Sequence, residues 1–304
     1  MKNTWNGSRK RINSNSLPFA SIIIAAHNNA KTLKKVIKSM LALNYQNYEI
    51  IIVDDGSTDD TEETVKLFLD SKKINYFRFS KNVGVCKARN KGIELAKYNI
   101  VVNMDHDCIP QKNWLKLLVE GFDSKKVGIV SSYAHYGGTS TAFRKNLLEK
   151  VGGYDEDYGY YREDTDLSFK IMELGYEFKL VKADFLHDHT EAMPQGLTGM
   201  AKYVLKRLKY HQNDVLLYKK HPTKTCREFL HIKYGFLIDP YKDFSVATGL
   251  WQGKFNLSSP RGLVFLNANA WWKKAIIIIA GITYVFLVKS SRLIGSIKHR
   301  KLLL

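Results

Sequence analysis

The stretch that decides the fold is SIIIAAHNNAKTLKKVIKSMLALNYQNYEIIIVDDGS, residues 21–57. Two short apolar runs, residues 21–26 and 48–53, flank residues 31–43, whose apolar side chains recur at the three- and four-residue spacing of a helix. Strands that are apolar throughout are typical of a parallel sheet covered on both faces. The stretch therefore predicts a strand, a helix and a second strand that stops at Asp54-Asp55-Gly56-Ser57.

The same alternation continues to about residue 130 and then weakens. It predicts strands at 75–79, 99–104 and 127–132 and helices at 61–69, 85–96 and 114–122. A later helix is predicted at 163–174, with acidic residues at its start. The sequence thus indicates an α/β fold with a mostly parallel sheet, whose right-handed crossovers gather the strand ends along one edge.

Composition limits the class of protein. With 304 residues, 45% of them hydrophobic and 25% charged, the chain is expected to be globular. Its three cysteines are scattered, which suits a reducing compartment and argues against a zinc cluster or a disulfide scaffold. Residues 1–17 are polar and lack an apolar core, so they are expected to form a flexible tail and not a secretory signal.

The net charge of +18 is concentrated in the last third of the chain. Residues 190–304 hold 19 Lys and Arg against 5 Asp and Glu, a net charge of +14, whereas residues 1–189 carry +4. Such a basic region can meet nucleic acid, anionic lipid or an anionic substrate. The same region contains 14 uncharged residues, 275–288, next to Trp271 and Trp272. As a helix they span about 21 Å, less than a bilayer core of about 30 Å, which favours a segment that dips into a membrane surface over one that crosses it. The alternative is a buried core helix.

Two carboxylates follow the apolar run at residues 100–104, in the sequence Asp105-His106-Asp107. Residues one apart at a strand end point the same way, and open parallel sheets bind ligands beyond the carboxyl ends of their strands. Carboxylate oxygens suit Mg²⁺ or Mn²⁺ with substrate phosphates. The pattern predicts a metal–diphosphate site, and a solvated turn is the alternative.

Four motifs occur in a fixed order. They are residues 21–28 with 31–33, residues 53–59, residues 82–93 leading to 105–107, and residues 151–155 followed by 162–167. Over residues 19–220 this order resembles the family 2 inverting glycosyltransferases of the GT-A fold. The resemblance implies a GT-A-like fold, with a Rossmann-like, mostly parallel sheet covered by helices and a helical C-terminal extension. The implied domains are a tail at 1–17, a catalytic domain at 18–190 and a basic, membrane-associated extension at 191–304. Within the catalytic domain, the nucleotide-sugar half ends at about residue 107 and the acceptor half follows it.

The resemblance also implies a binding site for a nucleotide-diphosphate sugar, with UDP favoured as the nucleotide. Its residues are Ala26, Asn28, Asp55, Gly84, Lys87, Arg89 and Asp105. Asp55 is expected to accept the imide hydrogen of the base. The alternatives are that Asp54 and Asp55 cap the turn that follows them, and that Lys87 and Arg89 lie on a solvated helix face. The chain departs from the family at Ala25-Ala26-His27, where Pro-Thr-Tyr is usual, and this leaves the identity of the base open.

The reacting groups follow from the same resemblance. Mn²⁺ or Mg²⁺ would be held by Asp107 and Asp105, with His187 as a third ligand and His189 in reserve. Asp164 would be the base that removes a proton from the acceptor hydroxyl, and Glu163 would position the acceptor. The alternative for Asp164 is a structural role, in which its negative charge at the helix N-terminus interacts favourably with the helix dipole. Asp166 is expected to be solvated or paired.

The function that the resemblance implies is that of a hexosyltransferase. It would move a hexose or N-acetylhexosamine to a hydroxyl of a lipid-linked or glycan acceptor, at the anionic inner face of the cell membrane, as a cytoplasmic peripheral or monotopic protein. Two other classes are weighed. One is an inactive scaffold of the same fold. The other is a basic RNA-binding protein, although no motif for nucleic-acid binding accompanies the charge and no nucleic-acid partner is expected.

Overall fold

The computed structural model describes residues 18–304 apart from residue 135 and residues 189–195, 251–255, 259–264 and 268–269. By its contacts the chain divides into two compact units. The first holds the residues up to Val83, Ala88–Gly153 and Leu174–His187, and the second holds Gly84–Lys87, Tyr154–Glu173 and Asp188–Leu304. The segment Tyr154–Glu173, which contains the predicted catalytic pair, therefore belongs with the C-terminal helices.

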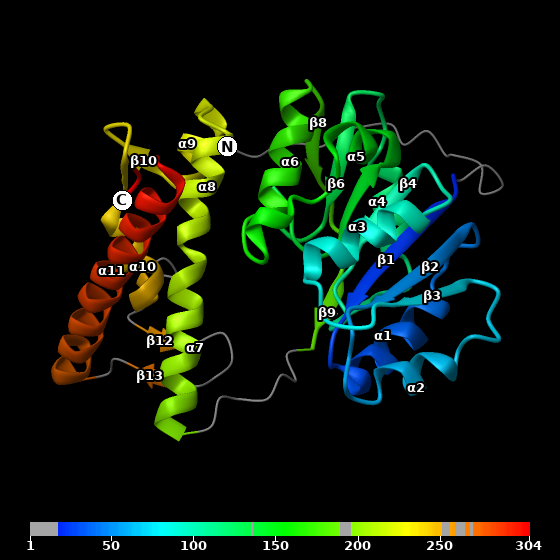
Figure 1. Cartoon of the computed structure of the whole chain (residues 1–304), viewed down its shortest axis with the longest axis horizontal. Helices are drawn as coiled ribbons and strands as arrows, with labels where there is room; N and C mark the ends of the chain where they lie inside the picture. Colours follow the sequence, from blue (N-terminus) through cyan, green and yellow to red (C-terminus); the bar gives the residue numbers. More distant parts are fainter. Residues whose placement is uncertain (1–17, 135, 189–195, 251–255, 259–264, 268–269) are drawn as a thin grey trace. The chain divides into compact units, whose positions relative to one another are not determined.

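The first unit is built on a seven-stranded sheet of order β3-β2-β1-β4-β7-β6-β8 (Figure 1). Its strands are β1 Ala20–Ala26, β2 Tyr48–Asp54, β3 Ile74–Arg78, β4 Ile100–Asn103, β6 Val127–Ser131, β7 Thr141–Arg144 and β8 Glu177–Leu180. β7 is antiparallel to β4 and β6, and the other neighbours are parallel. Since β1, β2 and β4 run the same way, their carboxyl ends lie along one edge of the sheet.

Helices cover both faces of this sheet. They are α1 Ala30–Leu41, α2 Thr61–Lys66, α3 Val85–Leu95, α4 Trp114–Glu120 and α5 Lys145–Val151. Ile22 and Ile24 of β1 share one buried core with apolar side chains of α1 and α4. Ile23 points to the opposite face, where a Cβ on Gly92 of α3 would lie 2.4 Å from its side chain. Every residue of β2 is buried, as expected for a central strand covered on both faces.

The predicted fold class is confirmed. Each strand and helix predicted between residues 21 and 132 is present, with ends that differ by no more than one helical turn. The antiparallel strand β7 was not predicted, because four residues, Thr141–Arg144, carry too little periodicity to be recognised. At the start of α2, Asp59 Oδ1 accepts a hydrogen bond from the Thr61 backbone N–H at 3.1 Å.

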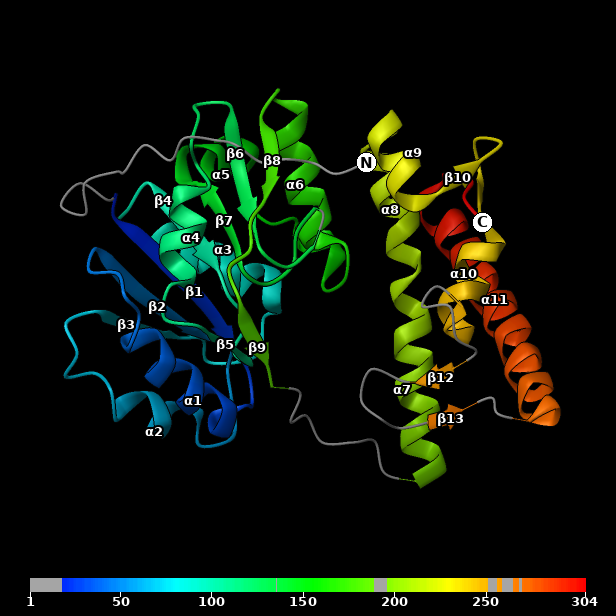
Figure 2. The same ribbon diagram turned by 180° about the vertical axis from the view of Figure 1, so that it is seen from behind.

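The second unit is helical with small hairpins. Its helices are α6 Glu163–Glu173, α7 Gly196–Tyr210, α8 Gln212–Lys220, α9 Lys224–Leu230, α10 Pro240–Thr248 and α11 Trp271–His299, preceded by a short 3₁₀ turn, η2, at Glu156–Tyr158. The hairpins pair β10 Ile232–Lys233 with β11 Leu237–Ile238, and β12 Asn256–Ser258 with β13 Phe265–Asn267. α11 packs against α8 and α10, and Figure 2 shows these helices from behind.

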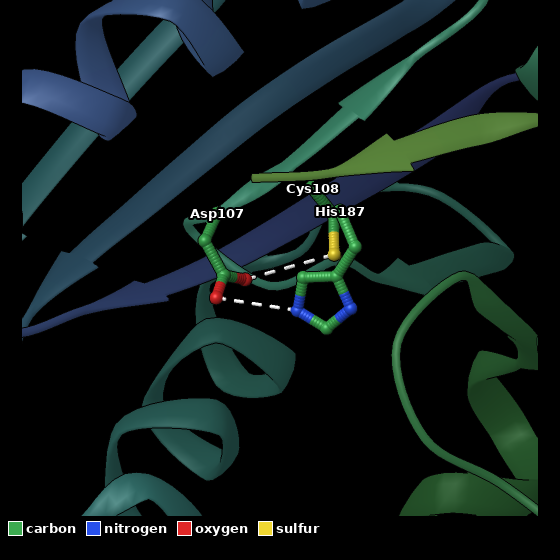
Figure 3. Close-up of side chains that lie close together, drawn as sticks. All are labelled: Asp107, Cys108 and His187. Atoms are coloured by element: carbon green, nitrogen blue, oxygen red, sulfur yellow. Dashed lines mark hydrogen bonds and ion pairs between the residues drawn. The ribbon is translucent and has the colours of Figure 1, made fainter. Parts of the chain in front are cut away.

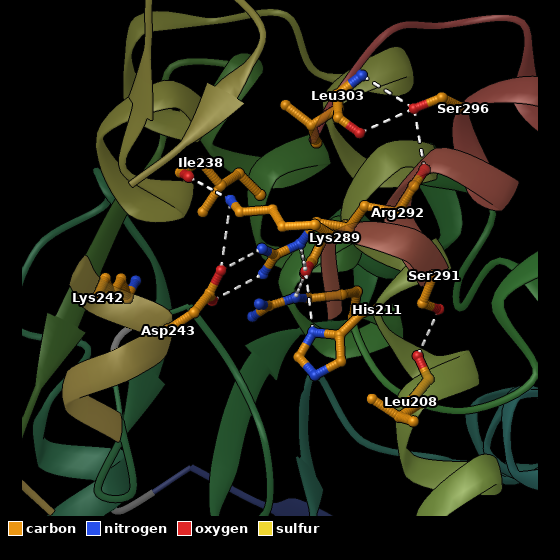
Figure 4. Close-up of polar contacts among 12 residues, drawn as sticks. Leu208, His211, Ile238, Lys242, Asp243, Lys289, Ser291, Arg292, Ser296 and Leu303 are labelled. Carbon is orange, nitrogen blue, oxygen red and sulfur yellow. Dashed lines mark hydrogen bonds and ion pairs between the residues drawn. The ribbon is translucent and has the colours of Figure 1, made fainter. Parts of the chain in front are cut away.

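The apolar segment at 275–288 is part of a much longer helix than its composition indicates. α11 has 29 residues and is, by length and composition, able to cross a membrane. The helix continues past the uncharged run through Lys289 and Arg292, and the charge of Arg292 is neutralised within the unit. Arg292 is 3% exposed, and its guanidinium contacts Asp214 Oδ2 at 3.1 Å. It also contacts Asp243 Oδ1 at 3.1 Å (Figure 4).

The two faces of α11 are inverted relative to a helix of a water-soluble protein. Its buried residues are Ile277, Gly281, Val288, Ser291, Arg292, Gly295 and Ser296, several of them small or polar. Its most exposed apolar residues beyond the tryptophans are Ile279, Ile282, Phe286, Ile294 and Ile297. Only one stripe of the helix is therefore buried, and the face that packs on the protein is less apolar than the face that does not.

Candidate active site

The loops that follow β1 and β2 are joined to each other at the carboxyl edge of the sheet. The Asp55 backbone N–H donates to the Ala26 carbonyl at 2.8 Å, and His27 Nδ1 lies 2.9 Å from the Asp55 carbonyl oxygen. Asn28, with φ of 51°, accepts from the Thr58 N–H on Oδ1 at 2.7 Å. Three of the predicted nucleotide-binding residues, Ala26, Asn28 and Asp55, thus lie together.

Asp55 has a structural contact of its own. It is 4% exposed, and its Oδ1 accepts from the Val83 N–H at 2.6 Å. This bond ties the second loop to the segment before α3. The next residue, Gly84, has φ of +94°, and an added Cβ would meet nothing within 4 Å. Its backbone conformation, rather than lack of space, explains the glycine.

The two predicted basic residues of α3 differ in their surroundings. Lys87 is exposed. Arg89 is 4% exposed, and its guanidinium Nη2 contacts Asp105 Oδ1 at 3.0 Å. Arg89 therefore does not lie on a solvated helix face. It holds the first carboxylate of the Asp105-His106-Asp107 motif.

Strand pairing brings His187 to Asp107. β5 (Cys108–Pro110) follows the motif and pairs antiparallel with β9 (Phe185–His187), so that Cys108 lies opposite His187. His187 Nε2 is 3.2 Å from Asp107 Oδ2 (Figure 3). Burial raises the pKa of Asp107, but the hydrogen bond from His187 and the positive charges of His106 and His187 outweigh it and hold the pKa below its usual value.

Among the residues that the structure describes, one group has metal-ligand spacing. Ligand atoms of Asp107, Cys108 and His187 all lie within 4.8 Å of one another. Burial, followed by the negative charge of Asp105, raises the pKa of the Cys108 thiol well above its ordinary value. Sulfur is a soft ligand, whereas Mn²⁺ and Mg²⁺ prefer oxygen ligands, so Cys108 is a poor match for these ions. The remaining carboxylate and imidazole fit Mn²⁺ or Mg²⁺, with substrate oxygens completing the coordination. Asp105 contributes no atom to this group, and His189 lies outside the described residues.

The predicted catalytic pair begins α6 in the second unit. Glu163 is 3% exposed, whereas Asp164 is half-buried. The Arg162 carbonyl accepts from the Asp166 N–H at 2.9 Å, which places Asp164 in the first turn of the helix. A carboxylate in this position is favoured by the helix dipole.

Asp166 is paired, which is one of its two expected roles. It is fully buried, and its Oδ1 lies 3.0 Å from both the Tyr158 hydroxyl and His221 Nε2. The other ring nitrogen of His221, Nδ1, is 2.8 Å from Glu173 Oε1. Burial lowers the pKa of His221, but its hydrogen bonds to Asp166 and Glu173 outweigh burial and raise the pKa above 6.5. The imidazolium therefore bridges two carboxylates of α6.

This bridge predicts a pH-dependent stability. Because the folded-state pKa of His221 is raised, its contribution is fully present below pH 6.5 and is lost as the pH rises through the folded-state pKa. We expect His221→Gln to lower the free energy of unfolding at pH 6 by roughly 1–3 kcal/mol. We also expect this free energy to vary less with pH between pH 6 and 9 in the variant than in the wild type. Urea denaturation across this range measures both effects. An equal slope in wild type and variant would contradict the prediction.

Some contacts of the site could not be found in the sequence. Thr139 Oγ1 accepts from the Asp105 N–H at 3.0 Å, and His106 Nδ1 lies 3.0 Å from the Ala25 carbonyl oxygen. The place of Cys108 near the site could have been predicted, since it directly follows Asp107 in the sequence, but the pKa of its thiol depends on its burial. The place of Thr139 could not, because its partner is 34 residues away.

Comparison with known proteins agrees with this geometry. The family described as glycosyl transferase family 2 matches residues 21–190, more than half of the chain. The chain belongs to glycosyl transferase family 2, and the class of protein predicted from the four motifs is confirmed.

Individual relatives are distant. The poly-beta-1,6-N-acetyl-D-glucosamine synthase of Staphylococcus aureus (strain COL) is 26% identical over 256 residues, which cover 72% of this chain and 60% of that protein. The synthase of the same name from Staphylococcus epidermidis is 27% identical over 195 residues, covering 52% and 47%. The chain thus spans about 60% of the length of the first relative.

Solved structures share the fold. The mannosyltransferase PcManGT from Pyrobaculum calidifontis, in complex with GDP-Man and Mn²⁺, superposes with a TM-score of 0.61 at 16% identity, over 98% of this chain and 91% of that one. S. aureus TarS superposes with a TM-score of 0.50 at 14% identity, over 90% and 55%. At these identities the likeness shows the fold alone.

Proposed function

We propose that this chain is a metal-dependent inverting hexosyltransferase, which moves a hexose or N-acetylhexosamine from a nucleotide-diphosphate sugar to a hydroxyl of a lipid-linked or glycan acceptor. The observation that carries the proposal is the pairing of Asp107 with His187 through the β5–β9 register. A carboxylate and an imidazole, held at the carboxyl edge of a mostly parallel sheet, are suited to a divalent cation and a diphosphate. The proposal includes a catalytic domain at residues 18–190 and a C-terminal extension at residues 191–304.

Residues at the carboxyl edge of the sheet and at the start of α3 would bind and orient the donor. Asp107 and His187 would hold Mn²⁺ or Mg²⁺, which, when bound, supplies positive charge that stabilises the diphosphate leaving group. The Arg89 guanidinium keeps Asp105 in place, and Asp105 would contact the ribose or the cation. Asp55 would accept the imide hydrogen of the base, with UDP favoured, and Gly84 and Lys87 would contact the diphosphate.

Asp164 would be the general base. Inversion requires one displacement at the anomeric carbon, in which the acceptor oxygen forms the new bond, the nucleoside diphosphate leaves, and the hydroxyl proton passes to a carboxylate. Asp164 is half-buried, so an acceptor can reach it, whereas its neighbour Glu163 is buried. Glu163 is assigned to the orientation of the acceptor.

A membrane surface is the proposed place of action, at its cytoplasmic face. The exposed face of α11 carries isoleucine and phenylalanine, and Trp271 and Trp272 begin the helix. The region that contains it has a net charge of +14, which favours anionic lipid. Because Arg292 is held by Asp214 and Asp243 on the buried face, α11 is proposed to lie in the interface plane with its exposed stripe towards lipid.

The exposed stripe of α11 predicts a specific loss of lipid binding. Ile282 and Phe286 are 59% and 69% exposed, so their replacement by aspartate removes apolar surface without opening the core. We expect the Ile282→Asp/Phe286→Asp double variant to bind phosphatidylglycerol vesicles at least about tenfold more weakly, since each tenfold corresponds to 1.4 kcal/mol. Co-sedimentation measures the binding. Leu67→Asp, equally exposed at 66% but in the first unit, is the matched control. Equal binding by both variants would count against a lipid-facing α11.

The function itself is tested by a donor screen. The purified full chain is mixed with UDP-N-acetylglucosamine, UDP-glucose, UDP-galactose or GDP-mannose and with Mn²⁺, Mg²⁺ or chelator. Acceptors are N-acetylglucosamine oligomers and polyprenyl phosphate in vesicles. Metal-dependent release of a nucleoside diphosphate, with labelled sugar in an acceptor, supports the proposal. Absence of turnover with every donor, together with unchanged thermal stability on adding the nucleotides, favours the inactive scaffold.

A further inference from the structure

The loop that precedes α6 has an unusual backbone. Gly159, Tyr161 and Arg162 have φ of +65°, +73° and +78°. Glycine adopts this region freely, but tyrosine and arginine rarely do, because their Cβ atoms crowd the backbone. Backbone strain of this kind persists only where neighbouring groups hold it, and it is concentrated at functional sites. Here it directly precedes Glu163 and Asp164.

Asn213 of α8 holds the carbonyl groups of this loop. Its Nδ2 lies within hydrogen-bond distance of the carbonyl oxygens of Tyr158 at 3.0 Å, Tyr160 at 2.9 Å and Tyr161 at 2.9 Å, so its two hydrogens are shared among three acceptors. Three acceptors around one amide nitrogen also fix the orientation of the amide, because the flipped group would point an oxygen at three oxygens. One side chain therefore binds three carbonyls of the strained loop.

Asp214, the next residue of α8, holds the side chain at the end of the loop. It is 0% exposed, and its Oδ1 accepts from Arg162 Nε at 2.7 Å. Its other oxygen is bound by Arg292 of α11, so the carboxylate is part of the buried ion-pair cluster whose Arg292 and Asp243 members appear in Figure 4. The Arg162 guanidinium also lies over the ring of Tyr161, 4.4 Å from its centroid.

On these contacts we propose that Asn213 and Asp214 are positioning residues for glycosyl transfer. They hold residues 158–162 in the strained conformation. This conformation fixes the orientation of the first turn of α6, and therefore that of the Asp164 carboxylate. The inference rests on the proposed function, in which Asp164 is the base. Positioning matters there because a base must lie within hydrogen-bond reach of the proton it accepts, and a misplacement of about 1 Å costs on the order of a hundredfold in rate.

Stability alone does not require this arrangement. An ordinary helix start has Ser, Thr, Asp or Asn in an extended conformation, whereas here the residue whose carbonyl accepts the first helical bond is Arg162 at positive φ. α6 is also attached further along by Asp166 and Glu173, which both contact His221. The contacts of Asn213 are therefore not needed to attach α6. They constrain the loop that precedes the catalytic pair.

The test is Asn213→Ala in the full chain. With UDP-N-acetylglucosamine or GDP-mannose, Mn²⁺ and the acceptors of the donor screen, we expect kcat to fall by roughly 10- to 100-fold while the donor KM stays within about twofold. Arg162→Lys keeps a charge beside Asp214 but loses the Nε contact, so its kcat should fall measurably, although less than that of Asn213→Ala. Hydrogen exchange at residues 158–164 should rise in Asn213→Ala.

Thr223→Ala is the matched control. Thr223 Oγ1 accepts from the Cys226 N–H at the start of α9, so its loss destabilises the same unit without touching the loop. It should lower the melting temperature comparably and leave kcat unchanged. If Asn213→Ala retains the kcat of Thr223→Ala, or raises only the donor KM, the positioning role is wrong while the proposed function stands. If Asn213→Ala does not fold, unchanged kcat in Arg162→Lys overturns the proposal. If the wild type turns over no donor, both proposals fall together.

Discussion

Replacement of Asp107 by alanine is expected to abolish donor turnover while the protein stays folded. The carboxylate lies beyond the end of β4 and contacts the His187 ring, and no apolar core depends on it. If Asp107 holds the cation, its loss removes several kcal/mol of charge stabilisation from the leaving diphosphate, which corresponds to roughly three decades in rate. The measurement is release of nucleoside diphosphate over a range of Mn²⁺ concentrations, with thermal unfolding followed in parallel.

A control variant distinguishes the loss of Asp107 from the loss of any other carboxylate in the same unit. Asp123→Ala removes a carboxylate of the same unit that is 60% exposed and pairs with Lys179 on the surface. It should keep wild-type turnover and the wild-type dependence on Mn²⁺. Wild-type turnover by Asp107→Ala in excess chelator would show that the reaction does not depend on a cation held at Asp107.

The second large effect is expected from Asp164→Asn. The amide has nearly the shape of the carboxylate but cannot accept the acceptor proton, so transfer should fall by roughly two to four decades while donor binding is unchanged. The rate of transfer and the donor affinity, from thermal shift with Mn²⁺, are measured on the same protein. Asp157→Asn changes a carboxylate that is 75% exposed in the same unit and serves as the matched control.

The alternative assignment within the pair is tested alongside it. Glu163 is assigned to the orientation of the acceptor, so Glu163→Gln should affect acceptor affinity more than the rate at saturating acceptor. Normal transfer by Asp164→Asn combined with loss in Glu163→Gln would move the base to Glu163. Equal, complete losses in both variants with loss of the melting transition would instead report unfolding of α6.

The order of strands and helices in the first unit could be predicted because its cause is local. Ile22, Ile24, Ile50 and Ile52 lie in short continuous apolar runs, and runs of this length between predicted helices are typical of buried strands. The position of Asp105 and Asp107 after a strand followed from the same pattern. The antiparallel direction of β7 did not, because it depends on how this strand pairs with β4 and β6 and not on the residues of Thr141–Arg144.

In the second unit the apolar run at residues 275–288 is shorter than the helix that contains it, α11. Charges at Lys289 and Arg292 set the end of the apolar run in the sequence, but α11 continues to His299. Asp243 and Asp214 neutralise these charges from two other helices, and neither partner can be recognised from the residues around Arg292.

The sequence by itself determined the class of fold, the family and the order of the motifs, since apolar periodicity and short motifs are properties of neighbouring residues. Only the tertiary structure decided which distant groups meet. The β5–β9 register brings His187 to Asp107, Arg89 is committed to Asp105, and Asn213 and Asp214 hold the loop before Asp164. The physical reason is that pairing register and the neutralisation of buried charge are set by packing between segments far apart in the chain.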